Sequence, residues 1–526
     1  MYASAHSVPL RNRYLDATTA LALAQGLRHG VIDDQAKEKI VKSYSDVAEM
    51  AQGSASIYGI NTGFGPLCTT KIAPKDTLAL QRNILMSHAV GVGKPIDRSL
   101  SALMMVLKIH ALAQGYSGIS LATLERIIKM LDCGLIPVVP SQGSVGASGD
   151  LAPLSHLFLP LIGLGELWSE EKIVPAAPLL EQQGFGPLTL GPKEGLALIN
   201  GTQFILAHAV QVLAQFQKCL DQADLSAALM VEALQGSAKP FDRELHLLRP
   251  FAGCMHVAER MRQFLGDSDI MKDHEHCDRV QDPYSLRCVP QVHGASRNAW
   301  LHLKELVHIE LNAVTDNPVV LGENNAISGG HFHGQPLAMA LDYAALALAE
   351  LGNISDRRIY LALEGKSAGV PKLLMEDTGI HSGYMILQYT TAALASENKS
   401  LCFPASADSI PTSLGQEDHV SMGSISGRKA LQISDNVLRI LSIEVLTAAQ
   451  ALTFRRPLAS GVLLDAVYQK IRSEISFAPK DRIFYHDIEK ATQWVSEGIL
   501  LNTVKNEAAL QGISLKTAFS EQFDQY

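Results

Sequence analysis

The chain has 526 residues, a formal net charge of −9 and a pI near 6.1. This acidic balance argues against a nucleic-acid-binding surface, and the length exceeds that of a usual single domain. The N-terminal stretch has no apolar run typical of a signal peptide, and the seven cysteines are scattered without a CxxC pair. We therefore expect a reduced, cytoplasmic protein.

Helical patterns dominate the chain and lengthen after its first 200 residues. Residues 163–195 are rich in Gly and Pro, which predicts irregular structure or short strands. The most apolar helix candidate, 337–352, contains Asp342 and Glu350, so we expect no membrane span. The pattern predicts a mainly α fold, with an N-terminal region at 1–200 and a long-helix bundle with C-terminal helices at 201–526. Long helices are predicted at 202–235, 291–314, 334–365 and 428–456.

The most distinctive local feature is the glycine-rich loop SQGSVGASGDLAPLSH, Ser141 to His156. The simplest interpretation is a tight turn that leads into a helix at Asp150; no GK[ST] follows, so it is not a phosphate loop. Ser148 can lose water to leave a dehydroalanine, and the nitrogen of Gly149 can close onto the Ala147 carbonyl. The product would be a methylidene-imidazolone ring, an electrophile that no standard side chain provides. A following helix N-terminus would make that ring more electron-poor.

Six sequence blocks in one order extend this hypothesis along nearly the whole chain. Together they resemble the aromatic amino acid ammonia-lyase family. The resemblance implies a self-made methylidene-imidazolone (MIO) ring with no external cofactor and no metal, and elimination of ammonia from an aromatic amino acid. It also implies a mainly helical fold of the ammonia-lyase/fumarase-like type in a homotetramer. The blocks are YGINTGFG at 58, GSVGASGDLAPLSH at 143, EGLALINGT at 194, QDPYSLRCVPQ at 281, SGGHFHG at 328 and QEDHVSM at 416.

Two positions indicate which aromatic amino acid is used. Ser87-His88 is typical of members that act on histidine, whereas tyrosine types carry His-Leu and phenylalanine types Phe-Leu. Glu417 has the same implication, because phenylalanine types tend to carry Gln there. A carboxylate can hold the N–H of an imidazole, and a phenyl ring would leave it unpaired. We therefore expect L-histidine to be converted to urocanate and ammonia, the first step of histidine degradation.

The resemblance also implies roles for further residues. Tyr58 matches the base that removes the β-proton, which would require its pKa to be lowered towards neutral, and Glu417 is an alternative base or proton shuttle. Arg287 matches the ligand of the substrate carboxylate, for which a planar guanidinium fork is suited. Taken alone, Tyr58 would be a core aromatic and Arg287 a surface ion pair. The other matches are Asn200 and Gln281 (ring or substrate), Tyr284 (amino group), Phe332 (pocket wall) and Asp150 (support of the ring loop).

The chain departs from the family pattern at two places. His331 stands where Asn is frequent, and Val289 stands where members that act on histidine often carry Gln. Both lie near the expected site, and neither removes a catalytic atom, so they weaken the substrate assignment rather than the reaction class.

Three alternative functions are also compatible with the sequence. Within the class, a tyrosine or phenylalanine ammonia-lyase or an aminomutase would use the same ring. A metal-dependent hydrolase could be built on DHEHCD at 273–278, although its spacing is too close for usual structural zinc sites and favours a solvated loop. The third alternative is a helical scaffold whose loop never cyclises.

Overall fold

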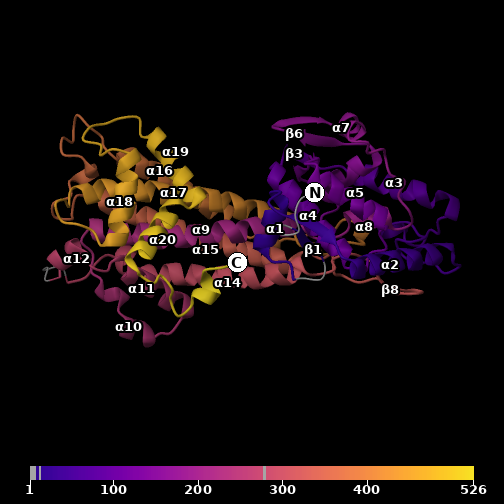
Figure 1. The fold of residues 1–526 in the computed structure, drawn as a ribbon, viewed down its shortest axis with the longest axis horizontal. Helices are drawn as coiled ribbons and strands as arrows, with labels where there is room; N and C mark the ends of the chain where they lie inside the picture. Colours follow the sequence, from indigo (N-terminus) through magenta and orange to yellow (C-terminus); the bar gives the residue numbers. More distant parts are fainter. Residues whose placement is uncertain (1–6, 11–13, 276–279) are drawn as a thin grey trace. The chain divides into compact units, whose positions relative to one another are not determined.

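The computed structural model describes residues 7–10, 14–275 and 280–526, and the chain divides into two compact units (Figure 1). The described part of the predicted N-terminal region, 1–200, lies wholly in unit 1. The segments of unit 1 are Met1–Gln211, Lys304–Asp342 and Pro404–Arg428, and those of unit 2 are Val212–Leu303, Tyr343–Phe403 and Lys429–Tyr526.

Unit 1 combines short helices with small sheets. In the segment predicted to be irregular or short β structure, β6 (Glu166–Ser169) and β7 (Lys172–Pro175) form an antiparallel hairpin that β4 (Ile136–Pro137) extends. The other sheets pair β1 (Ser7–Leu10) with β2 (His29–Ile32), β3 (Val92–Pro95) with β5 (Pro140–Gln142), and β8 (Val319–Gly322) with β9 (Asn325–Ile327). The helices are α1 (Ala17–Ala24), α2 (Asp34–Gln52), α3 (Thr77–His88), α4 (Arg98–Ala113), α5 (Leu121–Asp132), α6 (Leu151–Phe158), α7 (Ala176–Gln182) and α8 (Glu194–Ile199).

Helix α4 forms the core of unit 1, and a second helix group has several of the predicted site residues at or near its helix ends. Nearly every side chain of α4 is buried, and α1, α2 and α5 pack against it. Helices α3, α6 and α8 pack against one another. This packing matters because α3 ends at His88, α6 starts just after Ser148, and α8 ends just before Asn200.

Unit 2 holds most residues of the long helices, whose remaining turns belong to unit 1, and these helices close into a bundle. These are α9 (Gln203–Ala233), α14 (Val289–Leu311), α15 (Gln335–Leu363) and α17 (Gly423–Thr453). Each has a neighbour on both sides, so the predicted mainly α, long-helix fold is confirmed. The side-chain contacts that join successive helices are Trp300 to the Leu213 carbonyl, Ser296 to the Ala347 carbonyl, Ser355 to Glu444, and Cys219 to the Ser434 carbonyl.

The long helices lie close to their predicted spans. Helix α9 is buried on all sides through most of its length, as expected for a run with apolar residues on more than one face. Among the described residues, α15 alone is long and apolar enough to cross a membrane by length and composition. However, 67% of its most apolar window is buried inside the structure, as in the core helix of a globular protein.

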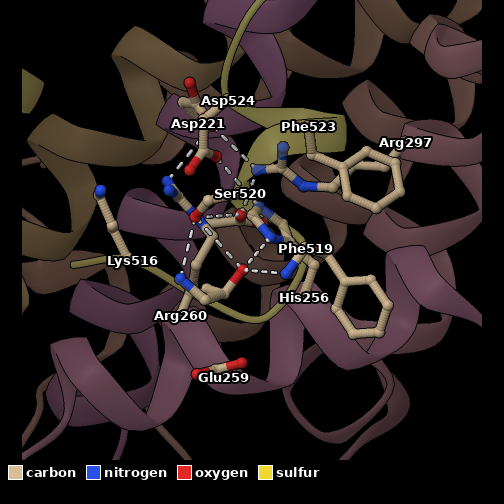
Figure 2. A network of polar contacts seen from close by, with 12 residues as sticks. Asp221, His256, Glu259, Arg260, Arg297, Lys516, Phe519, Ser520, Phe523 and Asp524 are labelled. Carbon is tan, nitrogen blue, oxygen red and sulfur yellow. Dashed lines mark hydrogen bonds and ion pairs between the residues drawn. The ribbon is translucent and has the colours of Figure 1, made fainter.

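Shorter helices surround this bundle, and the C-terminal segment packs on it through a polar network (Figure 2). His256 Nδ1 lies 2.7 Å from Thr517 Oγ1, and Phe523 is fully buried. In the same network, Arg260 and Arg297 both pair with Asp221. The surrounding helices are α10 (Arg243–Leu247), α11 (Ala252–Phe264), α12 (Asp269–Asp273), α13 (Tyr284–Arg287), α16 (Met385–Leu401), α18 (Val462–Glu474), α19 (Tyr485–Glu497), α20 (Ile499–Gln511) and α21 (Ser520–Phe523).

Candidate active site

A cavity of about 470 Å³ in unit 1 is lined by five of the twelve predicted site residues. Its size is within the usual range for small-molecule pockets. Its wall is largely apolar, with a few polar groups that can orient a ligand. The predicted residues that line it are Tyr58, His88, Ser148, Asn200 and Glu417, and the apolar lining includes Phe64, Leu67, Ile72, Leu80, Ile84, Leu151 and Leu196.

The backbone of the Ala147-Ser148-Gly149 loop packs closely against Gly201. Gly149 has φ +75°, and a Cβ there would lie 2.1 Å from the Gly201 carbonyl oxygen, so only glycine can occupy this position. The next amide, that of Asp150, donates to the same Gly201 oxygen at 2.8 Å. Ala147 is 5% exposed, so its carbonyl lies within the protein. The surroundings are therefore suited to holding a compact ring made from these three residues.

Asp150 is fully buried and connects the loop to two helix N-termini. Its Oδ2 accepts the backbone N–H groups of Phe204 and Ile205 at the start of α9, both at 3.0 Å, and its Oδ1 accepts Ser144 Oγ at 3.0 Å. Helix α6 starts at Leu151, one residue after the predicted start at Asp150, which is its N-cap residue. Burial raises the pKa of Asp150 to about 7, although all three hydrogen bonds favour the carboxylate. The positive ends of two helices therefore lie beside the loop.

Glu417 reaches the loop directly. Ser148 Oγ donates to Glu417 Oε1 at 2.7 Å, although the two residues are 269 positions apart in the sequence. The second oxygen, Oε2, accepts the hydroxyls of Thr412 at 2.8 Å and Ser413 at 3.1 Å. The carboxyl group is therefore fixed from one side and directed at Ser148 from the other.

Tyr58 and His88 face the same cavity with opposite pKa changes. Burial raises the pKa of the Tyr58 phenol, and the negative charge of Glu417 raises it further. The Gly65 amide, 3.3 Å from the phenol oxygen, opposes this only in part. In the single chain, desolvation therefore moves the pKa of Tyr58 away from the neutral range that a working base would need. Burial lowers the pKa of His88, which favours a neutral imidazole.

Gln281, Tyr284 and Arg287 form a separate cluster in unit 2. Arg287 Nη2 donates to Gln281 Oε1 at 2.8 Å, and its guanidinium lies 4.4 Å from the centre of the Tyr284 ring. Its Nε donates to the Asp282 carbonyl at 2.9 Å. Tyr284 is 70% exposed, so this cluster presents a cation and an aromatic ring at the surface of unit 2 in the single chain.

The other residues singled out from the sequence are not among the residues that line the cavity. Phe332 is half-buried in unit 1 and is not among the residues that line the cavity. Of the two departures, His331 is exposed, and Val289 is fully buried in the core of unit 2. Residues 276–278 of the DHEHCD motif lie outside the described residues. Within the described residues, no group of three or more His, Cys, Asp or Glu side chains is placed to hold a metal.

The sequence interpretation missed the residues that hold Glu417. Thr412 and Ser413 were not singled out, although both hydroxyls bind its carboxylate. A hydroxyl pair four to five positions before an acidic residue is common in polar loops, so the pattern by itself carries little signal. The short 3₁₀ turn η7 (Ser413–Gly415), with Thr412 and Glu417 bridged across it, brings these groups together.

Comparisons with known proteins agree with this geometry. The family model for aromatic amino acid lyase matches residues 15–473. The chain is 44% identical to a histidine ammonia-lyase of Natranaerobius thermophilus over 90% of this chain and 94% of that protein, and 47% identical to one of Sorangium cellulosum over 87% and 91%.

Solved structures show the same fold. The crystal structure of histidine ammonia-lyase from Trypanosoma cruzi has a TM-score of 0.89 and 37% identity, and covers 98% of this chain and 97% of its own. A tyrosine aminomutase from Streptomyces globisporus has a TM-score of 0.90 and 33% identity, and covers 95% and 99%. The motif blocks, the cavity over Ala147-Ser148-Gly149 and these matches together place the chain in the aromatic amino acid lyase family.

Proposed function

We propose that the protein is a histidine ammonia-lyase, which converts L-histidine to urocanate and ammonia without oxidation, the first step of histidine degradation. The observation that carries this proposal is the hydrogen bond between Ser148 and Glu417 inside a cavity that Tyr58 and His88 also line. An apolar cavity with one fixed carboxylate suits a side chain that is both aromatic and an N–H donor. The names of the relatives support the same substrate.

The reaction needs an electrophile, which we assign to Ala147, Ser148 and Gly149. The Gly149 nitrogen bonds to the Ala147 carbonyl carbon, which also forms a double bond to the Ser148 nitrogen, and the carbonyl oxygen leaves as one water with the amide protons of Ser148 and Gly149. Ser148 then loses its Cα proton and its hydroxyl as a second water. The resulting methylidene-imidazolone supplies an electrophilic carbon for the substrate amino group. The clash that any Cβ at position 149 would make with the Gly201 carbonyl supports this assignment.

Glu417 and His88 are assigned to the imidazole of the substrate. Loss of the Ser148 hydroxyl on ring formation would leave Glu417 Oε1 without its present donor, while Thr412 and Ser413 still hold Oε2. The freed oxygen can then accept the imidazole N–H. His88, kept neutral by burial, can stack on the imidazole or hydrogen-bond to it.

Proton removal is assigned to Tyr58, with Glu417 as the alternative base. The base takes the β-proton of histidine, the electron pair of that C–H bond forms the Cα–Cβ double bond, and the amino group leaves as ammonia. Because burial raises the pKa of Tyr58, a nearby positive group must lower it before the phenolate forms at neutral pH. Arg287 is assigned to the substrate carboxylate, Tyr284 to the amino group, Gln281 and Asn200 to the ring or the substrate, and Phe332 to the pocket wall.

We further propose a homotetramer in which neighbouring subunits complete each site. The cavity belongs to unit 1, whereas Gln281, Tyr284 and Arg287 belong to unit 2. Large apolar side chains on the long helices of unit 2 remain uncovered in the single chain, which supports burial against other subunits. They include Tyr343, Leu346 and Tyr360 of α15 and Ile386 and Tyr389 of α16, which are 47–61% exposed. No disulfide joins the described cysteines, which supports a cytoplasmic location.

The test is a direct comparison of substrates on the purified full-length protein. Urocanate absorbance is followed with histidine, and the corresponding unsaturated acids are followed with tyrosine and phenylalanine. A clear preference for histidine supports the proposal. Preferred turnover of tyrosine, or a β-amino acid product, would replace it with a tyrosine lyase or an aminomutase, the activity named for one structural relative. Activity that chelators abolish would favour the metal-dependent alternative.

A further inference from the structure

Two fully buried lysines of unit 1 lie behind the cavity, and the reaction described above uses neither. Lys108 on α4 is 1% exposed, and Lys193, just before α8, is fully buried. A buried ammonium loses its hydration and therefore needs protein partners. Lys193 Nζ lies 2.6 Å from Asp316 Oδ2 and donates to the Ser117 carbonyl at 3.0 Å. Its role is thus accounted for by a buried ion pair.

Lys108 has a different partner. Its Nζ donates to the backbone carbonyl of Asn200 at 2.5 Å. Burial lowers the pKa of Lys108 to about 8, with Lys193 lowering it and Asp316 and Asp150 raising it. The group therefore remains mainly protonated at neutral pH, so a charged donor is fixed to the peptide that carries Asn200.

Every polar atom of Asn200 except Oδ1 takes part in a hydrogen bond. Its carbonyl accepts Lys108, and its Nδ2 donates to the Asn317 carbonyl at 3.0 Å. Its Oδ1 is buried and accepts no hydrogen bond from the described residues. Asn200 is also among the residues that line the cavity with Ser148, so this oxygen is an unused buried acceptor on a residue of the site. A buried acceptor left unpaired is costly unless a ligand completes it.

The residue after Asn200 is fixed from the opposite direction. The Gly201 carbonyl accepts the Asp150 amide at 2.8 Å, and Gly149 packs against the same carbonyl so closely that no Cβ would fit. The segment Asn200–Gly201 is therefore held between Lys108 on one side and the ring-forming loop on the other.

We propose that Lys108 is a positioning residue for the elimination, whose ammonium holds the Asn200–Gly201 segment so that Asn200 Oδ1 accepts an N–H of the substrate amino group. This inference rests on the proposed function, because it takes the surroundings of Ser148 as the reaction centre. The amino group becomes more positive as it bonds to the electrophile and departs, so an oxygen acceptor binds it more strongly in the transition state than in the ground state. Loss of the positioning should therefore lower kcat more than it changes KM.

The decisive experiment is a double-mutant cycle between positions 108 and 200 in the full-length protein. Lys108→Met keeps the length of the side chain and removes its charge. We expect kcat for histidine to fall roughly 10- to 100-fold, the range for losing a charge-assisted hydrogen bond, with KM within about threefold. In the Asn200→Ala background the same substitution should change kcat by less than about threefold, since the acceptor is already absent.

Lys193→Met is the matched control, because it removes an equally buried ammonium that does not contact Asn200. It should lower the temperature of unfolding while kcat stays within about threefold of the unmodified protein. Intact mass provides a readout besides activity: the Lys108→Met protein should still have lost two waters. A full-mass Lys108→Met protein, or an equal kcat loss in both backgrounds, would overturn the positioning role.

Lys108→Arg keeps the proposal testable if Lys108→Met does not fold, since it retains a charged donor. A kcat within about tenfold of the unmodified protein supports the proposal, and a folded, ring-bearing Lys108→Arg protein as slow as Asn200→Ala contradicts it. The unmodified protein is assayed first in every series. If it does not release ammonia from histidine, the proposed function fails. If it is active but the kcat losses of the two substitutions in the double-mutant cycle are additive, only the role of Lys108 is ruled out.

Discussion

Replacing Glu417 by Gln tests how the site selects its substrate. The substitution preserves shape and a neutral acceptor but removes the charge that would face the imidazole N–H. Thr412 and Ser413 hold the other carboxylate oxygen, so the side chain cannot turn away freely. A hydrogen bond to a charged group contributes about 1.5–3 kcal/mol. We therefore expect kcat/KM for histidine to fall roughly 10- to 100-fold, while the ring and the helical fold persist.

The assay compares urocanate formation with trace turnover of phenylalanine by the same Glu417→Gln protein. Phenylalanine turnover should be spared or improved, because an apolar ring no longer faces a carboxylate in the cavity. Histidine turnover within about twofold of the parent, under roughly 0.5 kcal/mol, would refute the reasoning and reopen the tyrosine alternative. An equal loss on both substrates would instead assign Glu417 to proton transfer. Thr412→Val, which keeps the charge and loosens its support, should cause a smaller loss.

Three further predictions address the ring, the assembly and the core. The active protein should weigh less than its sequence by two waters, whereas Ser148→Ala should keep its full mass and helical fold but lose turnover. Tyr58→Phe and Arg287→Ala chains should restore some activity when co-expressed, and no rescue in verified mixed tetramers would place both residues in one subunit's pocket. Burial raises the pKa of Glu232 from 4.5 to about 7, so its contribution to stability is complete below pH 4.5 and lost as pH rises through 7. In denaturant titrations, the stability of Glu232→Gln relative to the parent should therefore rise by about 1.4 kcal/mol per pH unit across that window, and a flat difference would contradict the burial effect.

The local sequence was sufficient to locate the long helices, because the helical spacing of apolar residues and the scarcity of Gly and Pro are properties of neighbouring residues in the chain. The helix predicted at 202–235 is α9, Gln203–Ala233. The helix predicted to start at 428 begins at Gly423 instead. Glycine usually ends a helix. Here Gly427 lies inside the helix, and a Cβ at this position would lie 2.8 Å from His208 Cβ, so the glycine allows α9 to pack closely against α17. That distinction depends on a neighbouring helix rather than on the local sequence.

The sequence by itself also indicated the loop to which we assign the chemistry, because the proposed ring would form from three adjacent residues, Ala147-Ser148-Gly149. Only the tertiary structure decided what surrounds that loop. It brought Glu417 to Ser148 across 269 positions, and it assigned Arg287 to unit 2 and the cavity to unit 1. It also set the sign of the Tyr58 pKa change and buried Lys108 against Asn200. Desolvation and long-range contacts depend on every residue that excludes water from a group, and no local pattern records them.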